Sequence, residues 1–155
     1  MKNRLLIATL LIFYVIILSS GIMTIGCSKD TGSIDDKIIR KFSVAGVKLG
    51  MGENEAAKEL QQFAKKVGGI LYGRCVIQRN RIVYLCVGLS NNKISSIRFH
   101  ASFAKIPYNA YGMDVTAAKI FLKDKYNIKL DNNNSYKGDK LMVTLHTQYI
   151  TFKLK

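Results

Sequence analysis

Few residues of this chain have the types and the spacing that catalysis or metal binding would need. The two histidines, His100 and His146, have no acidic residue close to them in the sequence, and both are expected on the surface of strands. The sequence holds no Gly-rich phosphate loop, no Gly-x-Ser-x-Gly elbow and no group of His, Cys, Asp and Glu at metal-ligand spacing. We therefore expect a protein that is not an enzyme, without catalytic residues, metal or cofactor. An enzyme of another type would need a deep pocket that holds a carboxylate or histidine with a perturbed pKa.

Two of the three cysteines, Cys75 and Cys86, have a spacing that could form a disulfide. They lie in two apolar segments that flank residues 79–81 and are expected to pair as a hairpin. If the hairpin is centred on residues 80 and 81, the two cysteines are direct cross-strand neighbours, with Cβ atoms close enough to bridge. Because disulfides persist in exported proteins, the sequence predicts a Cys75–Cys86 bond. The alternative is a pair of free, buried thiols.

The third cysteine, Cys27, ends a stretch with the features of a secretory signal. Lys2 and Arg4 give a positive start, and residues 5–25 carry no charged side chain. Residues 24–27 (Thr-Ile-Gly-Cys) then resemble a bacterial lipobox, in which the cysteine is lipidated and becomes the first residue of the mature chain. The alternative is an uncleaved membrane anchor, since the apolar stretch is long enough to span a bilayer.

The lipobox resemblance implies a location. Residues 1–26 would be a signal peptide, and acyl chains such as palmitate on Cys27 would hold the protein at a membrane, because several chains are needed for stable anchoring. Ser28, rather than Asp, follows the cysteine. In lipoproteins of this kind an Asp there retains the protein at the inner membrane, so the resemblance implies the outer membrane, with the domain facing the periplasm.

The mature chain is strongly basic. Removing residues 1–26 leaves 129 residues and lowers the formal charge from +14 to +12, because two basic residues and no acidic residue are lost. Outside the cytoplasm such a charge suits anionic lipid headgroups, lipopolysaccharide phosphates or an acidic protein surface, and nucleic acid is not expected. The basic residues are spread along the chain without a continuous run. The alternative is that they only keep the domain soluble.

The pattern of apolar residues predicts a tether followed by one domain. Residues 27–41 are polar and are expected to form a flexible tether, and the domain covers 42–155. Helices are expected over about 53–67 and 115–126, where apolar residues recur at helical spacing. Alternating apolar residues and turn signals predict strands over 70–78, 82–89, 94–103, 141–145 and 150–154.

These elements form two consecutive helix-then-strands units, at about 42–105 and 106–155. The fold class is therefore expected to be α+β, with an antiparallel sheet covered on one face by two helices. Gly50-Met51 stands before the first helix and Gly112-Met113 before the second, and Ala-Ala-Lys follows each pair. A Gly-Met pair before a helix and a meander of strands resembles the small envelope proteins of the β-lactamase-inhibitor-protein-like fold, including the SmpA/OmlA lipoproteins of the outer-membrane barrel-assembly machine. The resemblance implies fold and location, and no functional residue.

Exposed aromatic residues are the remaining functional candidates. Tyr108, Tyr111, Tyr136 and Tyr149 lie in or beside expected loops, where aromatic side chains often anchor protein interfaces. The alternative is that they cap the ends of a small core. We expect a lipid-anchored cell-envelope lipoprotein that acts as a non-enzymatic binding or scaffold protein with an envelope protein as partner. The second hypothesis is an inhibitor or exclusion factor that blocks an incoming enzyme or phage component.

Overall fold

The computed structural model describes residues 32–60, 65–67, 70–77 and 81–155. These residues belong to one compact unit, Gly32–Lys155. The predicted signal peptide and Cys27 lie outside the described residues, so the lipid anchor stays a prediction.

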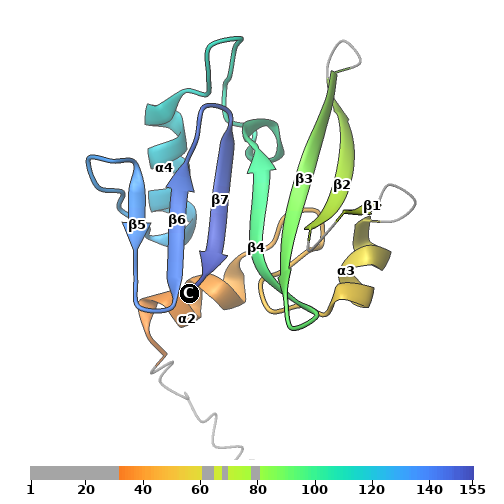
Figure 1. Ribbon diagram of the computed structural model, residues 1–155. Helices are drawn as coiled ribbons and strands as arrows, with labels where there is room; N and C mark the ends of the chain where they lie inside the picture. The colour runs from red at the N-terminus through yellow and green to blue at the C-terminus, as the bar shows by residue number, and fades with distance from the viewer. Residues whose placement is uncertain (1–31, 61–64, 68–69, 78–80) are drawn as a thin grey trace, which may run out of the picture. The chain divides into compact units, whose positions relative to one another are not determined.

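The described chain has the predicted α+β class, built on one antiparallel sheet (Figure 1). The strand order is β1-β2-β3-β4-β7-β6-β5. The strands are β1 (Lys65–Val67), β2 (Ile70–Ile77), β3 (Arg81–Ser90), β4 (Lys93–His100), β5 (Ser135–Lys137), β6 (Leu141–Leu145) and β7 (Tyr149–Leu154). The helices are α2 (Ile34–Lys41), α3 (Glu53–Leu60), the 3₁₀ turn η3 (Ala101–Ala104) and α4 (Val115–Tyr126).

Three predicted boundaries are wrong. Helix α3 ends at Leu60, and Lys65–Val67 of the predicted helix form strand β1. Val67 pairs with Ile70 across the sequence Gly68-Gly69, and Gly-Gly suits a two-residue hairpin as well as a helix end. The predicted strand over 94–103 gives way at residue 101 to η3, and the short strand β5 lies where no strand was predicted.

The two halves of the sheet meet at β4 and β7, which are the last strands of the two predicted units. Both Gly-Met segments contact a strand turn. Gly50 donates its backbone N–H to the carbonyl of Ile94 (2.8 Å), just after the β3–β4 turn. Met113 donates its N–H to the carbonyl of Thr147 (2.7 Å) in the β6–β7 turn. Each helix is therefore preceded by a segment fixed to the end of a hairpin of its own unit.

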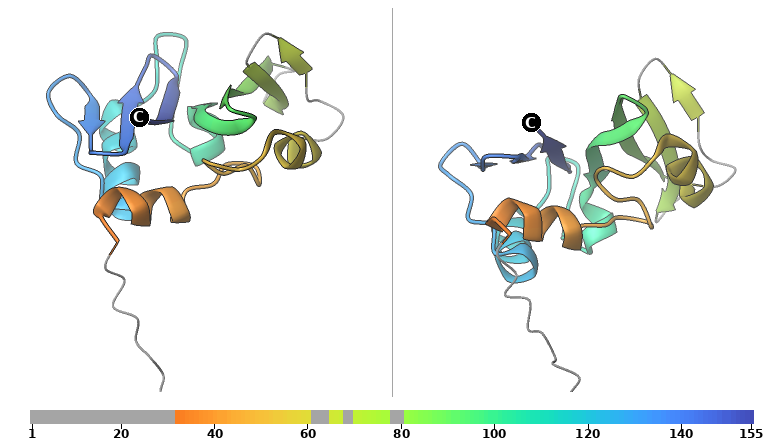
Figure 2. Two further views of the ribbon diagram at one scale, coloured as in Figure 1. Left: turned by 60° about the horizontal axis from the view of Figure 1, so that its bottom comes forward. Right: turned by 90° about the horizontal axis from the view of Figure 1, so that it is seen from below.

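The core lies on one face of the sheet. Phe42, just after α2, stacks on Phe152 of β7 with ring centroids 3.8 Å apart. Tyr126 at the end of α4 meets Phe152 edge-on at 5.6 Å, and Phe99 of β4 lies 6.0 Å from Phe42. Such aromatic pairs add to the free energy gained by burying apolar area. Figure 2 shows α2 and α4 together on one side of strands β5–β7.

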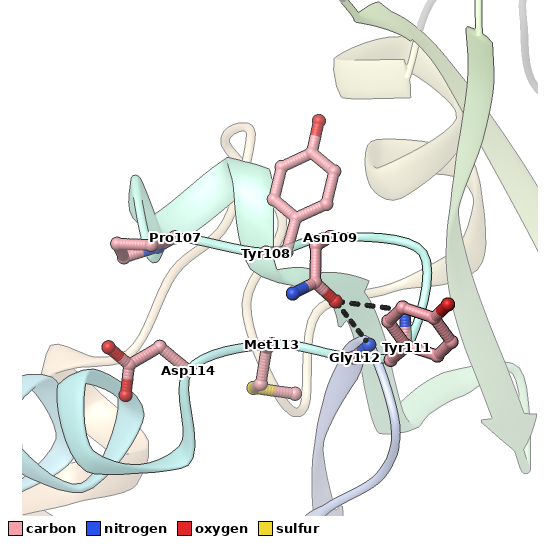
Figure 3. Close-up of a pocket in the computed structure, with 7 residues that line it drawn as sticks. All are labelled: Pro107, Tyr108, Asn109, Tyr111, Gly112, Met113 and Asp114. Atoms are coloured by element: carbon pink, nitrogen blue, oxygen red, sulfur yellow. Dashed lines mark hydrogen bonds between the residues drawn. The ribbon is translucent and has the colours of Figure 1, made fainter.

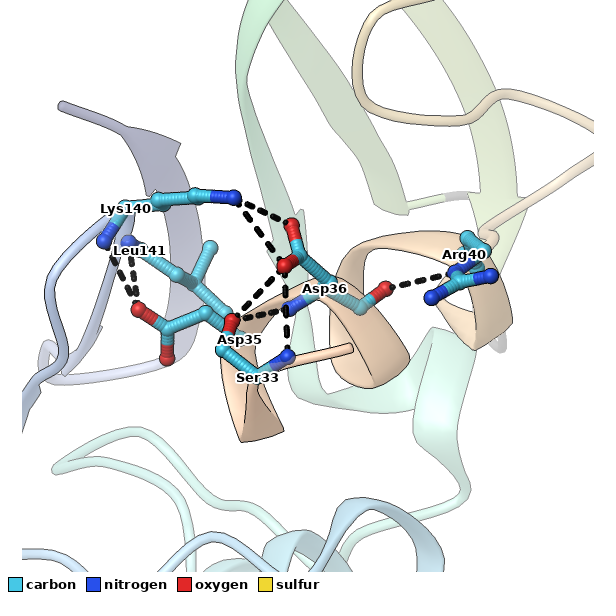
Figure 4. A network of polar contacts seen from close by, with 6 residues as sticks. All are labelled: Ser33, Asp35, Asp36, Arg40, Lys140 and Leu141. Atoms are coloured by element: carbon cyan, nitrogen blue, oxygen red, sulfur yellow. Dashed lines mark hydrogen bonds and ion pairs between the residues drawn. The ribbon is translucent and has the colours of Figure 1, made fainter. Parts of the chain in front are cut away.

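Residues 34–41 of the predicted flexible tether over 27–41 form helix α2, which adds a helix to the two predicted. Residues 27–31 lie outside the described residues. Ser33 caps the helix, and Asp36 completes a capping box by accepting from Ser33. Asp35 is buried, and its carboxylate accepts the backbone N–H groups of Lys140 (2.7 Å) and Leu141 (3.2 Å) (Figure 4). The helix therefore belongs to the domain, because its acidic residue is held by a turn more than a hundred residues away.

Candidate protein-binding surface

Residues 107–114 form a small hairpin between η3 and α4, which we call the 107–114 hairpin (Figure 3). Asp114 donates its backbone N–H to the carbonyl of Pro107 (2.8 Å), and Asn109 donates its N–H to the carbonyl of Gly112 (2.8 Å). The residues of this hairpin line an open hollow of about 470 Å³. Backbone hydrogen bonds across the hairpin thus fix its conformation.

The Asn109 side chain closes the tip of the hairpin. Its Oδ1 accepts the backbone N–H groups of Tyr111 (2.8 Å) and Gly112 (3.1 Å), as an Asx turn does. Gly112 has φ +158°, and a Cβ there would lie 2.9 Å from the carbonyl oxygen of Thr147. Glycine is therefore needed where the hairpin approaches the β6–β7 turn.

Tyr111 stands at the tip of this turn and is 91 % exposed. The other large apolar side chains that the structure gives as exposed have lower exposed fractions, such as 55 % for Ile120 on α4. Because the turn is held by hydrogen bonds of Asn109, Tyr111 is presented to solvent from a fixed backbone. Tyrosine offers a large contact area with few rotatable bonds, which favours a role in binding.

The base of the hairpin covers His100, which the sequence placed wrongly on the surface. His100 is 2 % exposed and lies edge-on between Tyr108 (ring centroids 4.5 Å apart) and Tyr149 (5.3 Å). Its Nδ1 accepts the backbone N–H of Ser102 (3.1 Å), so that the histidine caps η3. Burial lowers the pKa of His100, and a hydrogen bond with Gln148 opposes this shift. The neutral imidazole is therefore the form that the fold favours.

Gln148 connects this buried histidine to the hairpin. It contacts His100, and its Nε2 donates to the carbonyl of Asn109 (2.6 Å), the residue that closes the tip. Reasoning from the sequence missed Gln148, Asn109 and Gly112 as parts of the site. The sequence signal for the tip is the Asn-x-x-Gly spacing of residues 109–112, which is typical of a turn.

The structure brings together three of the four tyrosines predicted at an interface and separates the fourth. Tyr108 and Tyr149 flank His100, and Tyr111 stands at the tip of the same hairpin. Tyr136 lies on β5, where its hydroxyl donates to Oδ1 of Asp35 (2.7 Å). Burial and this hydrogen bond raise the pKa of Tyr136 to about 12. Tyr136 therefore holds α2 to the sheet, as the capping alternative predicts.

The predicted register of the cysteine hairpin is wrong. Cys75 pairs with Val83 and Cys86 pairs with Tyr72, so the two cysteines are displaced by three residues along the strands. Three residues of strand span roughly 10 Å, beyond the Cα separation that a disulfide allows. Cys86 is a free, partly buried thiol whose pKa is raised by burial, while the charge of Arg98 acts in the opposite direction. The structure therefore supports the free-thiol alternative for Cys86.

Within the described ranges, no group of three His, Cys, Asp or Glu side chains is placed to hold a metal ion. In the same ranges, no helix is both long enough and apolar enough to cross a bilayer. His146 lies at the β6–β7 turn and contacts the hydroxyl of Thr144 (3.2 Å). The 107–114 hairpin and the residues under it combine aromatic rings, the side-chain amides of Asn109 and Gln148, and the buried imidazole of His100.

Comparisons with protein-family models, with curated proteins and with solved structures gave no match for this chain.

Proposed function

We propose that this chain is a lipid-anchored protein of the bacterial cell envelope that binds a protein partner through the 107–114 hairpin and has no catalytic role. The observation that carries the proposal is Tyr111, which is 91 % exposed on a turn whose backbone is already held by hydrogen bonds. A rigid loop loses little conformational entropy on binding, so most of the free energy of contact is available for affinity.

The location rests on the sequence of residues 1–27. The apolar stretch and the lipobox-like residues 24–27 support export and acylation at Cys27. Since the cap of α2 is Ser33, only residues 28–32 remain between the anchor and the folded domain. A chain of this length spans at most about 20 Å. The domain would therefore stay close to the membrane surface, where a scaffold for a membrane assembly would act.

Photocrosslinking in intact cells tests the binding proposal. A photoreactive phenylalanine analogue at position 111 should give one discrete, heavier product from the envelope fraction. The same analogue at position 120 on α4, where Ile120 is also exposed, should not give that product. Equal products from both positions, or none from position 111, would contradict the proposal.

Intact mass of the membrane-extracted protein tests the anchor separately. A chain that begins at acylated Cys27 is the expected result. A full-length chain, or a chain cleaved without acylation, would contradict the lipoprotein proposal and leave the hairpin proposal to be judged by crosslinking alone.

The shape of the 107–114 hairpin also favours a second candidate, an inhibitor or exclusion factor. A tightly turned hairpin with one aromatic side chain at its tip can enter the cleft of an incoming enzyme or phage component. The two candidates differ in the effect on the crosslinked partner. Adding the purified protein should lower the activity of the partner if it inhibits, and should leave it unchanged if it scaffolds.

A further inference from the structure

The sheet has a second face, opposite the core, which we call the open face. Its residues alternate along the strands with the core residues. Two residues that alternate in this way, His100 and Ser135, are buried. The members on β3 to β7 that are at least partly exposed are Cys86, Ser96, Arg98, Lys137, Met142, Thr144, Tyr149, Thr151 and Lys153. Their neighbours on the same strands, such as Phe99 and Phe152, are buried in the core.

The charges of the strands have one sign. No acidic residue lies in the strands that the structure describes, whereas the strands contain Lys65, Lys66, Arg74, Arg81, Lys93, Arg98, Lys137 and Lys153. The acidic residues of the described chain lie in helices, turns and loops. The strands therefore add positive charge that no acidic residue within them offsets.

Arg98 on β4 and Lys153 on β7 lie on two adjacent strands in the interior of the sheet. Arg98 pairs with Thr151 and Ser96 pairs with Lys153, so the two cations are diagonal neighbours on adjacent strands. Diagonal neighbours on a sheet are roughly 7–8 Å apart, close enough for both to contact one acidic group or two adjacent ones. Both residues are exposed, and neither has an ion pair within the described part of the chain. Lys137 lies at the edge strand, where Asp131 partly offsets its charge.

Two side chains beside these cations, Tyr149 and Thr151, favour contact with a carboxylate. The guanidinium of Arg98 lies over the ring of Tyr149, 4.7 Å from its centroid, which holds it at the surface. Thr151 lies between Arg98 and Thr144 in the register, and among the described residues its Oγ1 is a buried side-chain oxygen without a hydrogen-bond partner. An unsatisfied hydroxyl is costly, and a change of its rotamer would let it donate to an incoming carboxylate.

We infer that the open face is a docking surface for the acidic surface of a partner protein, with Arg98 and Lys153 contacting its carboxylates. This inference rests on the proposed binding function and adds the chemistry of the partner. Tyr149 joins the two regions, since it lies beside Arg98 on the open face and beside His100 under the 107–114 hairpin. Complementary charge speeds the encounter and fixes the orientation of a partner whose apolar contact is made by Tyr111.

The open face is accessible to a partner protein. Ile38 of α2 is buried in the core, and Phe42, which follows the helix, stacks on the core side of β7. Helices α3 and α4 also bury residues in the core, so within the described chain no helix covers the open face.

Binding of poly-L-glutamate to the full chain in detergent micelles tests the inference. The variant Arg98→Glu/Lys153→Glu should weaken binding at least tenfold. The control Lys119→Glu/Lys123→Glu changes the same charge on the exposed side of α4 and should stay within twofold of wild type. Binding should also weaken as salt is added, because the contact is between charges.

Three outcomes would overturn the inference. Equal losses in both double variants would mean that only the total charge matters. If poly-L-glutamate does not bind to the wild-type protein, the proposal of an acidic partner is rejected. If phosphatidylglycerol micelles bind at Arg98 and Lys153 and poly-L-glutamate does not, the ligand of the open face is a lipid. Crosslinking from position 111 separates the two proposals, since a product from position 111 without glutamate binding keeps the hairpin function and rejects the acidic partner.

Discussion

Gly138 leaves the space that the carboxylate of Asp35 occupies. A Cβ built on Gly138 would overlap both carboxylate oxygens, although the two residues are far apart in the sequence. The same carboxylate accepts from Tyr136, Lys140 and Leu141. The buried carboxylate of Asp35 thus holds the start of the domain to the β5–β6 turn, and it fits there because Gly138 has no side chain.

Removing the carboxylate should destabilise the domain. Asp35→Ala leaves two backbone N–H groups and the Tyr136 hydroxyl without their acceptor, and we expect a loss of about 2–4 kcal/mol in the free energy of unfolding. Urea unfolding measures it. Asp124→Ala, an exposed change in α4, is the matched control and should have little effect. A loss no larger than that of the control would contradict the structural role of Asp35.

The same carboxylate should give the domain an acid limit. Burial raises the pKa of Asp35, but the hydrogen bonds from Tyr136 and from the backbone of Lys140 and Leu141 outweigh it and lower the pKa below 3.8. Its contribution to stability is therefore present above the unfolded pKa and is lost as the pH falls through the lowered folded value. Asp35→Asn should be less sensitive than wild type to acid in this range.

Gly138→Ala should destabilise the domain only while Asp35 is present. The added methyl group overlaps the carboxylate, and an overpacked site of this kind costs about 1–3 kcal/mol. In the Asp35→Ala background the space is free, so the second change should cost much less. A double-mutant cycle in urea measures this coupling. Gly52→Ala meets nothing within 4 Å and serves as control. Additive effects would show that the two residues do not share the site.

His100 should make the stability of the domain depend on pH. Its folded pKa is lowered by burial, so the unfolded chain binds the proton more tightly. Stability should fall as the pH drops from about 6.5 toward the lowered folded value, and stay level above 6.5. Thermal unfolding between pH 7.5 and 5 compares wild type with His100→Gln, which should lack this slope. The control His146→Gln alters an exposed histidine, and this variant should keep the same dependence of stability on pH as wild type. An unchanged slope in His100→Gln would assign the effect to other groups.

Cys75 and Cys86 should both react with iodoacetamide in denaturant without prior reduction, because the register does not bring them together. Mass spectrometry should find the same number of labels with and without a reductant. In the folded protein Cys86 should react slowly at neutral pH and faster as the pH rises, since burial raises its pKa. Labels that appear only after reduction would restore the predicted disulfide.

The local sequence predicted the helices and strands whose bounds do not depend on contacts with distant segments. Helix α4 has its predicted bounds because an Asp cap, helical spacing of apolar residues and a final Asn coincide. Strand β6 is likewise as predicted, and β2, β3 and β7 differ from prediction by a residue or two at their ends. The alternation in β4 also identified the core residues Ile97 and Phe99. These signals act between neighbours in the chain, so the sequence alone carries them.

Only the tertiary structure decided the rest, because contacts between distant segments overrode local composition. Helix α2 (Ile34–Lys41) belongs to the domain and not to a flexible tether because backbone N–H groups of the β5–β6 turn donate to the carboxylate of Asp35. His100 is buried because Tyr108 and Tyr149 close over it from two other segments. Pairing of whole strands sets the register that separates Cys75 from Cys86. Arg98 and Lys153 become diagonal neighbours for the same reason, since sheet order, rather than sequence order, places β4 beside β7.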